Sequence, residues 1–238
     1  SHLTLVVHLL DALERGVQGD VVARVLNRQN TLAVMPTGAG KSPCYQLPSV
    51  VLEGTCVVIS PLIALMHDQL RAAEAVGIRA ATLTSADDNR AETIARFRGG
   101  ELDLLYVAPE RASSSHFREL LSQAKIALFA IDEAHCVSEW GHDFRPDYRL
   151  LRPMLDRFEH VPRLALTATA DVPTRGDIME HLQLQEAALY NSGFDRPSSG
   201  FGQGCDQCSE THRQVRTTRV TTKLNTSLTK LLVQYRVQ

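Results

Sequence analysis

The stretch MPTGAGKS, residues 35–42, follows a short apolar run, TLAVM at residues 31–35, and precedes a segment with helical spacing. Gly38 and Gly40 let the backbone bend close to a polyanion, so that successive N–H groups can point at phosphate oxygens. Met35 stands where the usual G-x-x-x-x-G-K-[ST] pattern has its first glycine. The stretch predicts a phosphate-binding turn between a strand and a helix.

Two side chains at the end of this turn carry the chemistry that phosphates require. Lys41 supplies a positive charge for the β and γ phosphates, and the Ser42 hydroxyl suits Mg²⁺. The helix that follows directs its positive N-terminal end at the same place. Pro43 does not oppose this helix, because the first N–H groups of a helix lack intrahelical partners. The predicted ligands are therefore ATP and Mg²⁺.

A second motif, LFAIDEAH at residues 128–135, ends an apolar run in two adjacent carboxylates. A lone Asp-Glu pair is more often a solvated strand end. With the Lys41 turn upstream, we expect Asp132 to hold Mg²⁺ through water and Glu133 to orient and deprotonate the attacking water. Ligands of open parallel sheets bind beyond the carboxyl ends of strands, so both motifs should face one crevice.

Bulk composition bounds the class of protein. The chain has 238 residues, of which 44% are hydrophobic and 22% charged, enough for one core with an appendage. No apolar run approaches the roughly 20 residues that cross a bilayer, and no signal peptide is evident. Five cysteines, an odd number, fit a reducing compartment better than a disulfide framework. We therefore expect a cytoplasmic protein without membrane contacts, and the net charge of -2 does not by itself indicate a nucleic-acid binder.

Apolar runs and helical patterns alternate along most of the chain. Strands are predicted at residues 31–35, 55–60, 78–83, 102–107, 126–131 and 164–166, and helices at 3–15, 62–76, 86–98 and 172–182. Strands that alternate with helices of this length indicate βαβ units and a parallel sheet. The predicted fold is α/β: a three-layer RecA-like P-loop NTPase domain with a mostly parallel central sheet, spanning residues 1–197.

Residues 135–148, HCVSEWGHDFRPDY, look like the aromatic-rich loop that follows the DEAH box in RecQ DNA helicases. The segments MPTGAGKSPCYQLP, SPLIALMHDQ, YVAPER, LTATA and FDRP resemble other RecQ segments in the same order. The chain thus resembles the first motor domain of this superfamily 2 family over about residues 15–197. The resemblance implies an ATP-dependent DNA helicase that couples Mg-ATP hydrolysis to single-stranded DNA translocation and duplex unwinding.

The resemblance also assigns roles by position. Adenine contacts fall to Arg15 and Gln18, although spacing alone favours a surface role for Gln18. Phosphate contacts fall to Thr37, Gly38, Ala39, Gly40, Lys41 and Ser42; Mg²⁺ and water to Ser42, Asp132 and Glu133; and coupling to DNA to Arg111, Trp140, Phe144, Arg145, Thr167 and Thr169. Arg111 equally suits a structural ion pair.

The aromatic loop has a rationale independent of the resemblance. The single Trp of the chain, Trp140, lies with Phe144 and Arg145 in a polar segment beside the acids, a poor way to build a core. Stacking on a base contributes about 1–3 kcal/mol without demanding a sequence. For Phe144, filling a hydrophobic pocket is an equal alternative.

His135 has three possible roles: metal ligand, base, or relay between the nucleotide and the loop. Because only Cys136 stands nearby at ligand spacing, the relay is favoured. Cys205, Cys208 and His212 form an incomplete zinc ligand set, so a chance spacing or a free thiol pair is favoured there.

Residues 198–238 are a basic, Ser/Thr-rich tail that does not resemble the family's second RecA-like domain. In superfamily 2 motors that second domain completes the ATP site with an arginine finger, so we expect low activity of this chain alone. The expected partners are single-stranded and duplex DNA and a second RecA-like domain. Two alternatives stay open: a DEAH-class RNA helicase fragment, and a nucleotide- or DNA-binding module without turnover.

Overall fold

A seven-stranded sheet forms the centre of the computed structural model, which describes residues 17–84, 87–140, 143–184 and 186–191. The strands lie in the order β3-β4-β2-β5-β6-β1-β7, and every pairing between them is parallel. Their bounds are β1 Thr31–Val34, β2 Thr55–Ile59, β3 Ala80–Leu83, β4 Leu104–Val107, β5 Ile126–Ile131, β6 Arg163–Thr167 and β7 Ala188–Asn191. The predicted α/β class is confirmed.

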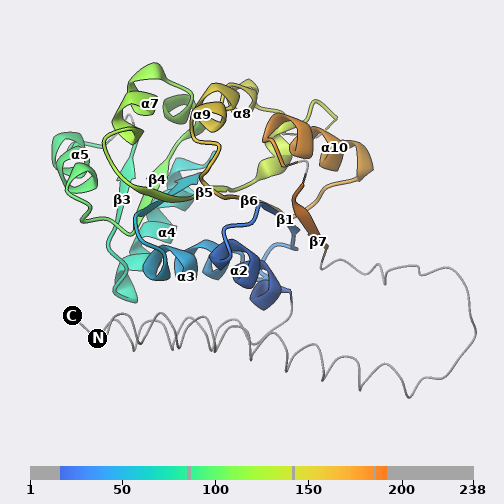
Figure 1. Cartoon of the computed structure of the whole chain (residues 1–238), viewed down its shortest axis with the longest axis horizontal. Helices are drawn as coiled ribbons and strands as arrows, with labels where there is room; N and C mark the ends of the chain where they lie inside the picture. Colours follow the sequence, from blue (N-terminus) through green and yellow to red (C-terminus); the bar gives the residue numbers. More distant parts are fainter. Residues whose placement is uncertain (1–16, 85–86, 141–142, 185, 192–238) are drawn as a thin grey trace, which may run out of the picture. The chain divides into compact units, whose positions relative to one another are not determined.

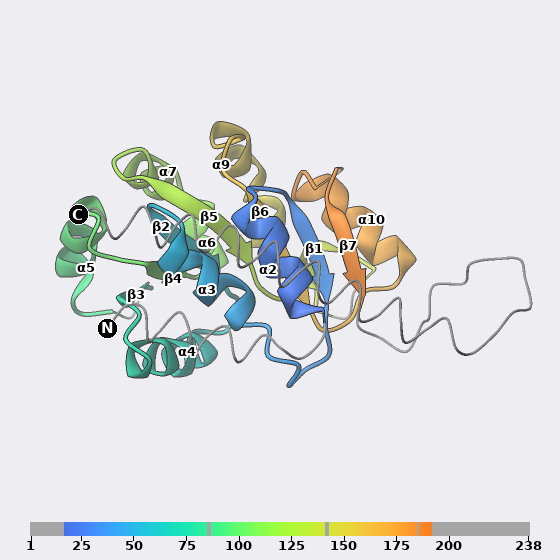
Figure 2. The same ribbon diagram turned by 60° about the horizontal axis from the view of Figure 1, so that its bottom comes forward.

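Helices cover both faces of this sheet and make the three layers. Figure 1 shows α2 and α3 on one face and α7, α9 and α10 on the other, and the turned view in Figure 2 agrees. The bounds are α2 Gln18–Leu26, α3 Pro43–Val51, α4 Ile63–Ala75, α5 Arg90–Arg98, α6 Pro109–Ala112, α7 Ser115–Leu121, α8 Pro146–Arg149, α9 Arg152–Arg157 and α10 Val172–His181, with a 3₁₀ turn, η1, at Ala134–Val137.

The central strands are buried along their whole length. All six residues of β5, IALFAI, are buried, as expected for a strand covered by helices on both faces. Phe129 of β5 packs edge-on against Phe158, with 5.9 Å between ring centroids. This contact joins β5 to Phe158, the residue that follows α9.

Predicted and observed elements agree except at ends and in short pieces. The strand predicted at residues 126–131 is observed at Ile126–Ile131, whereas the helix predicted from residue 86 begins at Arg90. β7 and the short helices α6 to α9 were not predicted. The helix predicted at residues 3–15, the domain boundary at residue 197 and the tail lie outside the described residues. No helix in the described ranges is long and apolar enough to cross a membrane.

The sheet order brings the two motifs to one edge. β1 and β5 flank β6, and in parallel strands all three carboxyl ends point the same way. Backbone bonds extend this register past the strands: Met35 N–H donates to the Thr167 carbonyl at 2.8 Å, and Asp132 N–H donates to Ile59 at 2.9 Å. The phosphate turn and the acidic pair therefore leave the sheet at the same edge, one on each side of β6.

Candidate nucleotide and nucleic-acid site

The turn between β1 and α3 has the backbone that its glycines predict. Gly38 and Gly40 have φ values of +83° and +69°, in the left-handed region that favours glycine. A Cβ on Gly40 would lie 2.9 Å from the Gln18 side-chain nitrogen. α3 begins at Pro43 directly after Lys41 and Ser42, so its positive end faces the turn.

Gln18, at the start of α2, is buried against this turn. Its side-chain amide donates to the backbone carbonyls of Ala39 and, at 3.0 Å, of Gly40. Its Oε1 is buried without a hydrogen-bond partner among the described residues. The surface role that spacing favoured is thus wrong, since Gln18 is only 5% exposed. The predicted contact with adenine stays a prediction, and Arg15 lies outside the described residues.

Lys41 and Glu133 meet across the end of the sheet. The Lys41 ammonium lies 3.6 Å from Glu133 Oε1, and their side chains are 15% and 22% exposed. Residues from motifs far apart in the chain therefore converge as the two motifs predicted. Because both side chains are only partly exposed, water screens the attraction between the two charges less than it does at the surface.

Asp132 is buried beside this ion pair, with 3% of its surface exposed. Burial raises its pKa, and the Glu133 charge adds to that rise; the Lys41 charge, the Glu133 N–H and a hydrogen bond from Gln69 oppose it. Gln69, on α4, is a site residue that sequence reasoning missed as a partner of the acid. Its segment, SPLIALMHDQ, had been assigned only by resemblance.

Replacing Asp132 with Asn is expected to stabilise the fold in the absence of nucleotide. A carboxyl whose pKa is raised on folding contributes stability at acid pH that is lost as the pH rises through its folded pKa. At neutral pH the buried charge therefore costs stability, and Asn removes it while keeping an acceptor for Glu133 N–H. Melting temperatures at neutral and acid pH measure this.

The Asp132→Asn advantage should shrink as the pH falls. Asp68→Asn is the matched control, because Asp68 is 72% exposed. A lower melting temperature for Asp132→Asn than for its parent at neutral pH would contradict the assignment of a charge penalty.

Glu133 has an unusual backbone, with φ 48° and ψ 44°. A non-glycine residue in the left-handed region costs about 1–3 kcal/mol, and such residues cluster at functional sites. The conformation turns the chain from β5 into η1 and directs the carboxylate at two partners. One is Lys41; the other is His135 Nδ1, 3.3 Å from Glu133 Oε2.

His135 links the acid to the end of β6. Its Nδ1 lies 2.9 Å from Thr167 Oγ1, and the Thr167 hydroxyl donates to the Thr169 carbonyl at 2.9 Å. Because that hydroxyl hydrogen is used, Thr167 accepts a hydrogen bond from Nδ1–H, which assigns this tautomer to the neutral ring. The contacts are those a relay requires, and they bring Thr167 to the site; Thr169 is exposed.

The aromatic loop begins at η1 and presents its Trp to solvent. Trp140 is 76% exposed, and the Trp140 backbone N–H donates to Ser138 Oγ at 3.2 Å. The Ser138 hydroxyl in turn donates to Asp177 of α10 at 2.7 Å. Asp177 was not foreseen, because a contact between residues 39 positions apart leaves no local signal.

Phe144 and Arg145 are both held by the protein. The Arg149 guanidinium lies 5.1 Å from the Phe144 ring centroid, and Arg149 also pairs with Glu139 at 2.6 Å. Arg145 donates to the Pro61 carbonyl at 3.2 Å. Phe144 is half-buried rather than sealed in a core. Arg111 of α6 makes no ion pair with a carboxylate of the described residues. The alternative role of Arg111 in a structural ion pair is therefore not supported.

The loop returns to the acid at its far end. The buried Tyr148 hydroxyl donates to the Asp132 carbonyl at 2.7 Å. Arg145 N–H also donates to the Cys136 carbonyl at 2.8 Å. Both ends of residues 135–148 are therefore attached beside Asp132 and Glu133.

This geometry agrees with a family match. Residues 15–178 match the DEAD/DEAH box helicase family. The chain belongs to that family. The helicase match covers every site residue described above, from Gln18 to Asp177.

Relatives of this helicase chain agree with the RecQ resemblance. It is 45% identical over 183 residues to the ATP-dependent DNA helicase RecQ of Haemophilus influenzae, which covers 76% of this chain and 30% of the relative. It is 46% identical over 178 residues to RecQ of Bacillus subtilis, covering 73% and 30%. The chain thus spans about a third of the length of these relatives, and the RecQ resemblance is confirmed for that part.

Solved structures support the helicase fold. A hypothetical ATP-dependent RNA helicase from Sulfolobus tokodaii aligns with a TM-score of 0.59 at 17% identity, covering 79% of this chain and 57% of that chain. The Hef helicase domain of Pyrococcus furiosus gives a TM-score of 0.57 at 16% identity, covering 77% and 39%. At these identities the likeness concerns the fold alone.

Proposed function

We propose that this chain is the ATP-binding first motor domain of a RecQ-like, ATP-dependent DNA helicase, acting in the nucleoid or the nucleus. The observation that carries the proposal is the 3.6 Å approach of Lys41 to Glu133 at the carboxyl edge of the sheet. The partners proposed for it are single-stranded and duplex DNA and a second RecA-like domain.

The residues at this edge fit ATP with Mg²⁺. The Ser42 hydroxyl and the Asp132 carboxylate are hard oxygen donors of the kind that Mg²⁺ prefers. Asp132 is buried beside a second carboxylate, an arrangement that favours a bound cation. Mg²⁺ would supply charge neutralisation for the phosphates. Gly38 and Gly40 would offer backbone N–H groups to phosphate oxygens, and Thr37 is exposed beside them. The predicted contribution of Ala39 is opposed by its own turn, since Ala39 N–H donates to the Pro36 carbonyl at 3.0 Å.

Lys41 and Glu133 would exchange partners during the cycle. Without nucleotide each neutralises the other. When Lys41 turns to the phosphates, Glu133 is released to orient and deprotonate a water, with His135 on its other oxygen. Through their contacts, His135 and Thr167 would then transmit this change of partner at Glu133 to the aromatic loop and to β6.

Replacing Lys41 with Ala is expected to weaken binding of Mg-ATP by about 10- to 150-fold, the loss of a hydrogen bond to a charged group of about 1.5–3 kcal/mol. Titration of the 238-residue chain with a fluorescent ATP analogue and Mg²⁺ measures this. Lys125→Ala is the matched control, since Lys125 pairs with Glu53 with its side chain 57% exposed. Equal affinity of K41A and its parent would defeat the motor proposal.

Trp140→Ala is expected to weaken binding of single-stranded DNA by about 1–3 kcal/mol, or about 5- to 150-fold, through the loss of one stacked base. Val172→Ala on α10 is the control, because Val172 has the same 76% exposure. Fluorescence anisotropy of labelled DNA and RNA strands measures both variants. Tighter binding of RNA than of DNA by the parent would favour the RNA helicase alternative.

A further inference from the structure

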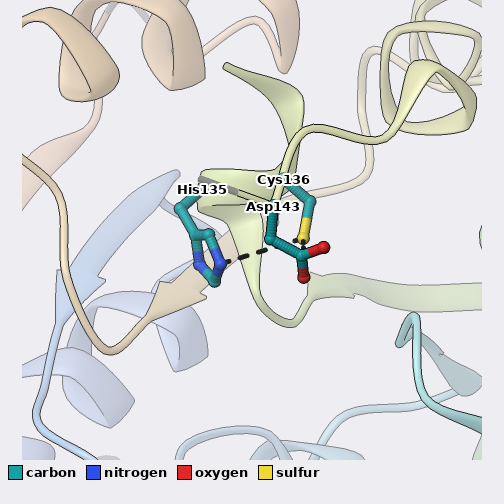
Figure 3. A group of neighbouring side chains, drawn as sticks. All are labelled: His135, Cys136 and Asp143. Carbon is teal, nitrogen blue, oxygen red and sulfur yellow. Dashed lines mark hydrogen bonds between the residues drawn. The ribbon is translucent and has the colours of Figure 1, made fainter. Parts of the chain in front are cut away.

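Three metal-ligating side chains gather where the acidic motif passes into the aromatic loop. Figure 3 shows His135, Cys136 and Asp143 turned toward one another. One ligand atom from each lies within 4.8 Å of the other two. Cys136 Sγ is 3.6 Å from Asp143 Oδ2 and 3.9 Å from His135 Nε2. The sequence alone had offered only Cys136 as a companion for His135, because Asp143 approaches through the folding of the loop.

The spacing suits a tetrahedral ion with nitrogen and sulfur ligands. Zn–S and Zn–N distances of about 2.3 and 2.0 Å at tetrahedral angles separate the two ligand atoms by about 3.5 Å. The two distances at Cys136 Sγ are close to that value. The third separation, between His135 and Asp143, is within 4.8 Å. Side-chain adjustments would bring all three atoms onto one ion, and solvent would complete the fourth position.

His135 is already oriented as a metal ligand. Its Nδ1 side faces Thr167 Oγ1 at 2.9 Å and Glu133 Oε2 at 3.3 Å, and its Nε2 side faces Cys136. Metal-binding histidines usually donate their other ring N–H to a carboxylate or another oxygen, which fixes the tautomer.

Asp143 has a comparable support. Arg145 Nε lies 3.6 Å from Asp143 Oδ1, and Cys136 faces the other oxygen, Oδ2. His135 and Asp143 are thus each oriented by a residue outside the proposed ligand set.

We infer that His135 Nε2, Cys136 Sγ and Asp143 Oδ2 form a binding site for Zn²⁺, whose occupancy restrains the aromatic loop. On binding, the thiol S–H bond breaks, a Zn–thiolate bond forms and the proton leaves to solvent, with no change of oxidation state. The effect on the loop rests on the proposed function. Cys136 and Asp143 bracket Trp140, so an ion joining them fixes the two ends of the segment that would stack on DNA.

Cobalt substitution tests the site without nucleotide or DNA. The full chain is used with Cys205→Ser and Cys208→Ser, which removes the other clustered thiols of the sequence. Titration with Co²⁺ is expected to give a thiolate-to-cobalt absorption band that saturates at one ion per chain and is displaced by Zn²⁺. Cys136→Ser and Asp143→Asn should each lose the band.

Two substitutions serve as matched controls. Cys56→Ala removes another buried thiol, in β2, and Asp147→Asn removes another carboxylate, in α8. Both should keep the band, and circular dichroism checks that each variant is folded. A band of unchanged strength in folded Cys136→Ser or Asp143→Asn would overturn the site.

Fluorescence of Trp140, the single Trp of the chain, measures the effect on the loop. Single-stranded DNA is expected to quench it, and Zn²⁺ should raise the DNA concentration needed for half-quenching in the parent but not in Cys136→Ser. An equal shift in both proteins would overturn the restraint. Absence of quenching without Zn²⁺ would instead count against the proposed function, while the cobalt band would still decide the metal site.

Discussion

Turnover of ATP is expected to rise by about 10³- to 10⁵-fold when a second RecA-like domain is joined after residue 197, the range that an arginine finger contributes. The described site supplies one cation toward the phosphates, Lys41, and it is paired with Glu133. Charge that develops on the transferred phosphoryl group therefore needs a further positive group from outside these residues. The part of the Haemophilus influenzae relative that this chain does not match is the source to test, because this chain covers 30% of that protein.

Steady-state ATP hydrolysis with and without single-stranded DNA measures the gain. The control is a fusion in which the arginine finger of the second domain is replaced by Ala. It tests whether covering the site is enough by itself, and it should keep the affinity for nucleotide while losing most of the gain in ATP turnover. If the isolated chain turned over ATP as fast as the fusion, the site would be complete in itself and the motor proposal would be wrong.

Glu133→Gln in the same fusion is expected to lower turnover by about 10²- to 10⁴-fold, the usual contribution of a general base. Gln keeps the shape of the side chain but neither accepts a proton from water nor neutralises Lys41. Affinity for Mg-ATP should therefore be retained or increased, because Lys41 no longer has to leave an ion pair. Single-turnover hydrolysis and equilibrium binding separate the two effects.

The control for this substitution is Glu139→Gln, whose side chain is 61% exposed and pairs with Arg149. It should leave single-turnover hydrolysis close to that of the parent. Undiminished hydrolysis in Glu133→Gln would mean that Glu133 only holds Lys41 and that another group activates the water.

Much of the fold could be predicted because its strands are buried on both faces. β5, a continuous apolar run, was predicted with its observed bounds. β7 was missed, since ALYN at the edge of the sheet is short and only partly buried. α5 was predicted to start at residue 86 but starts at Arg90, because helical spacing does not by itself mark the first residue of a helix.

The candidate site could be predicted only where residues adjacent in sequence share a task. Lys41 and Glu133 follow from two local motifs and a rule about strand ends. Gln69, Asp143 and Asp177 could not be found this way. Each reaches its partner through tertiary folding, as in the bond from Ser138 to Asp177.

The two attachments of residues 135–148 have a mechanical consequence. His135 is joined to Glu133 at one end, and Tyr148 holds the Asp132 carbonyl at the other. A displacement at the exposed Trp140 would therefore be transmitted from either end to two adjacent residues, through the Glu133 carboxylate on one side and the Asp132 backbone carbonyl on the other. Because both ends of residues 135–148 are attached to neighbouring residues, we expect the number of residues between the two attachments to matter as much as the aromatic side chains in the loop.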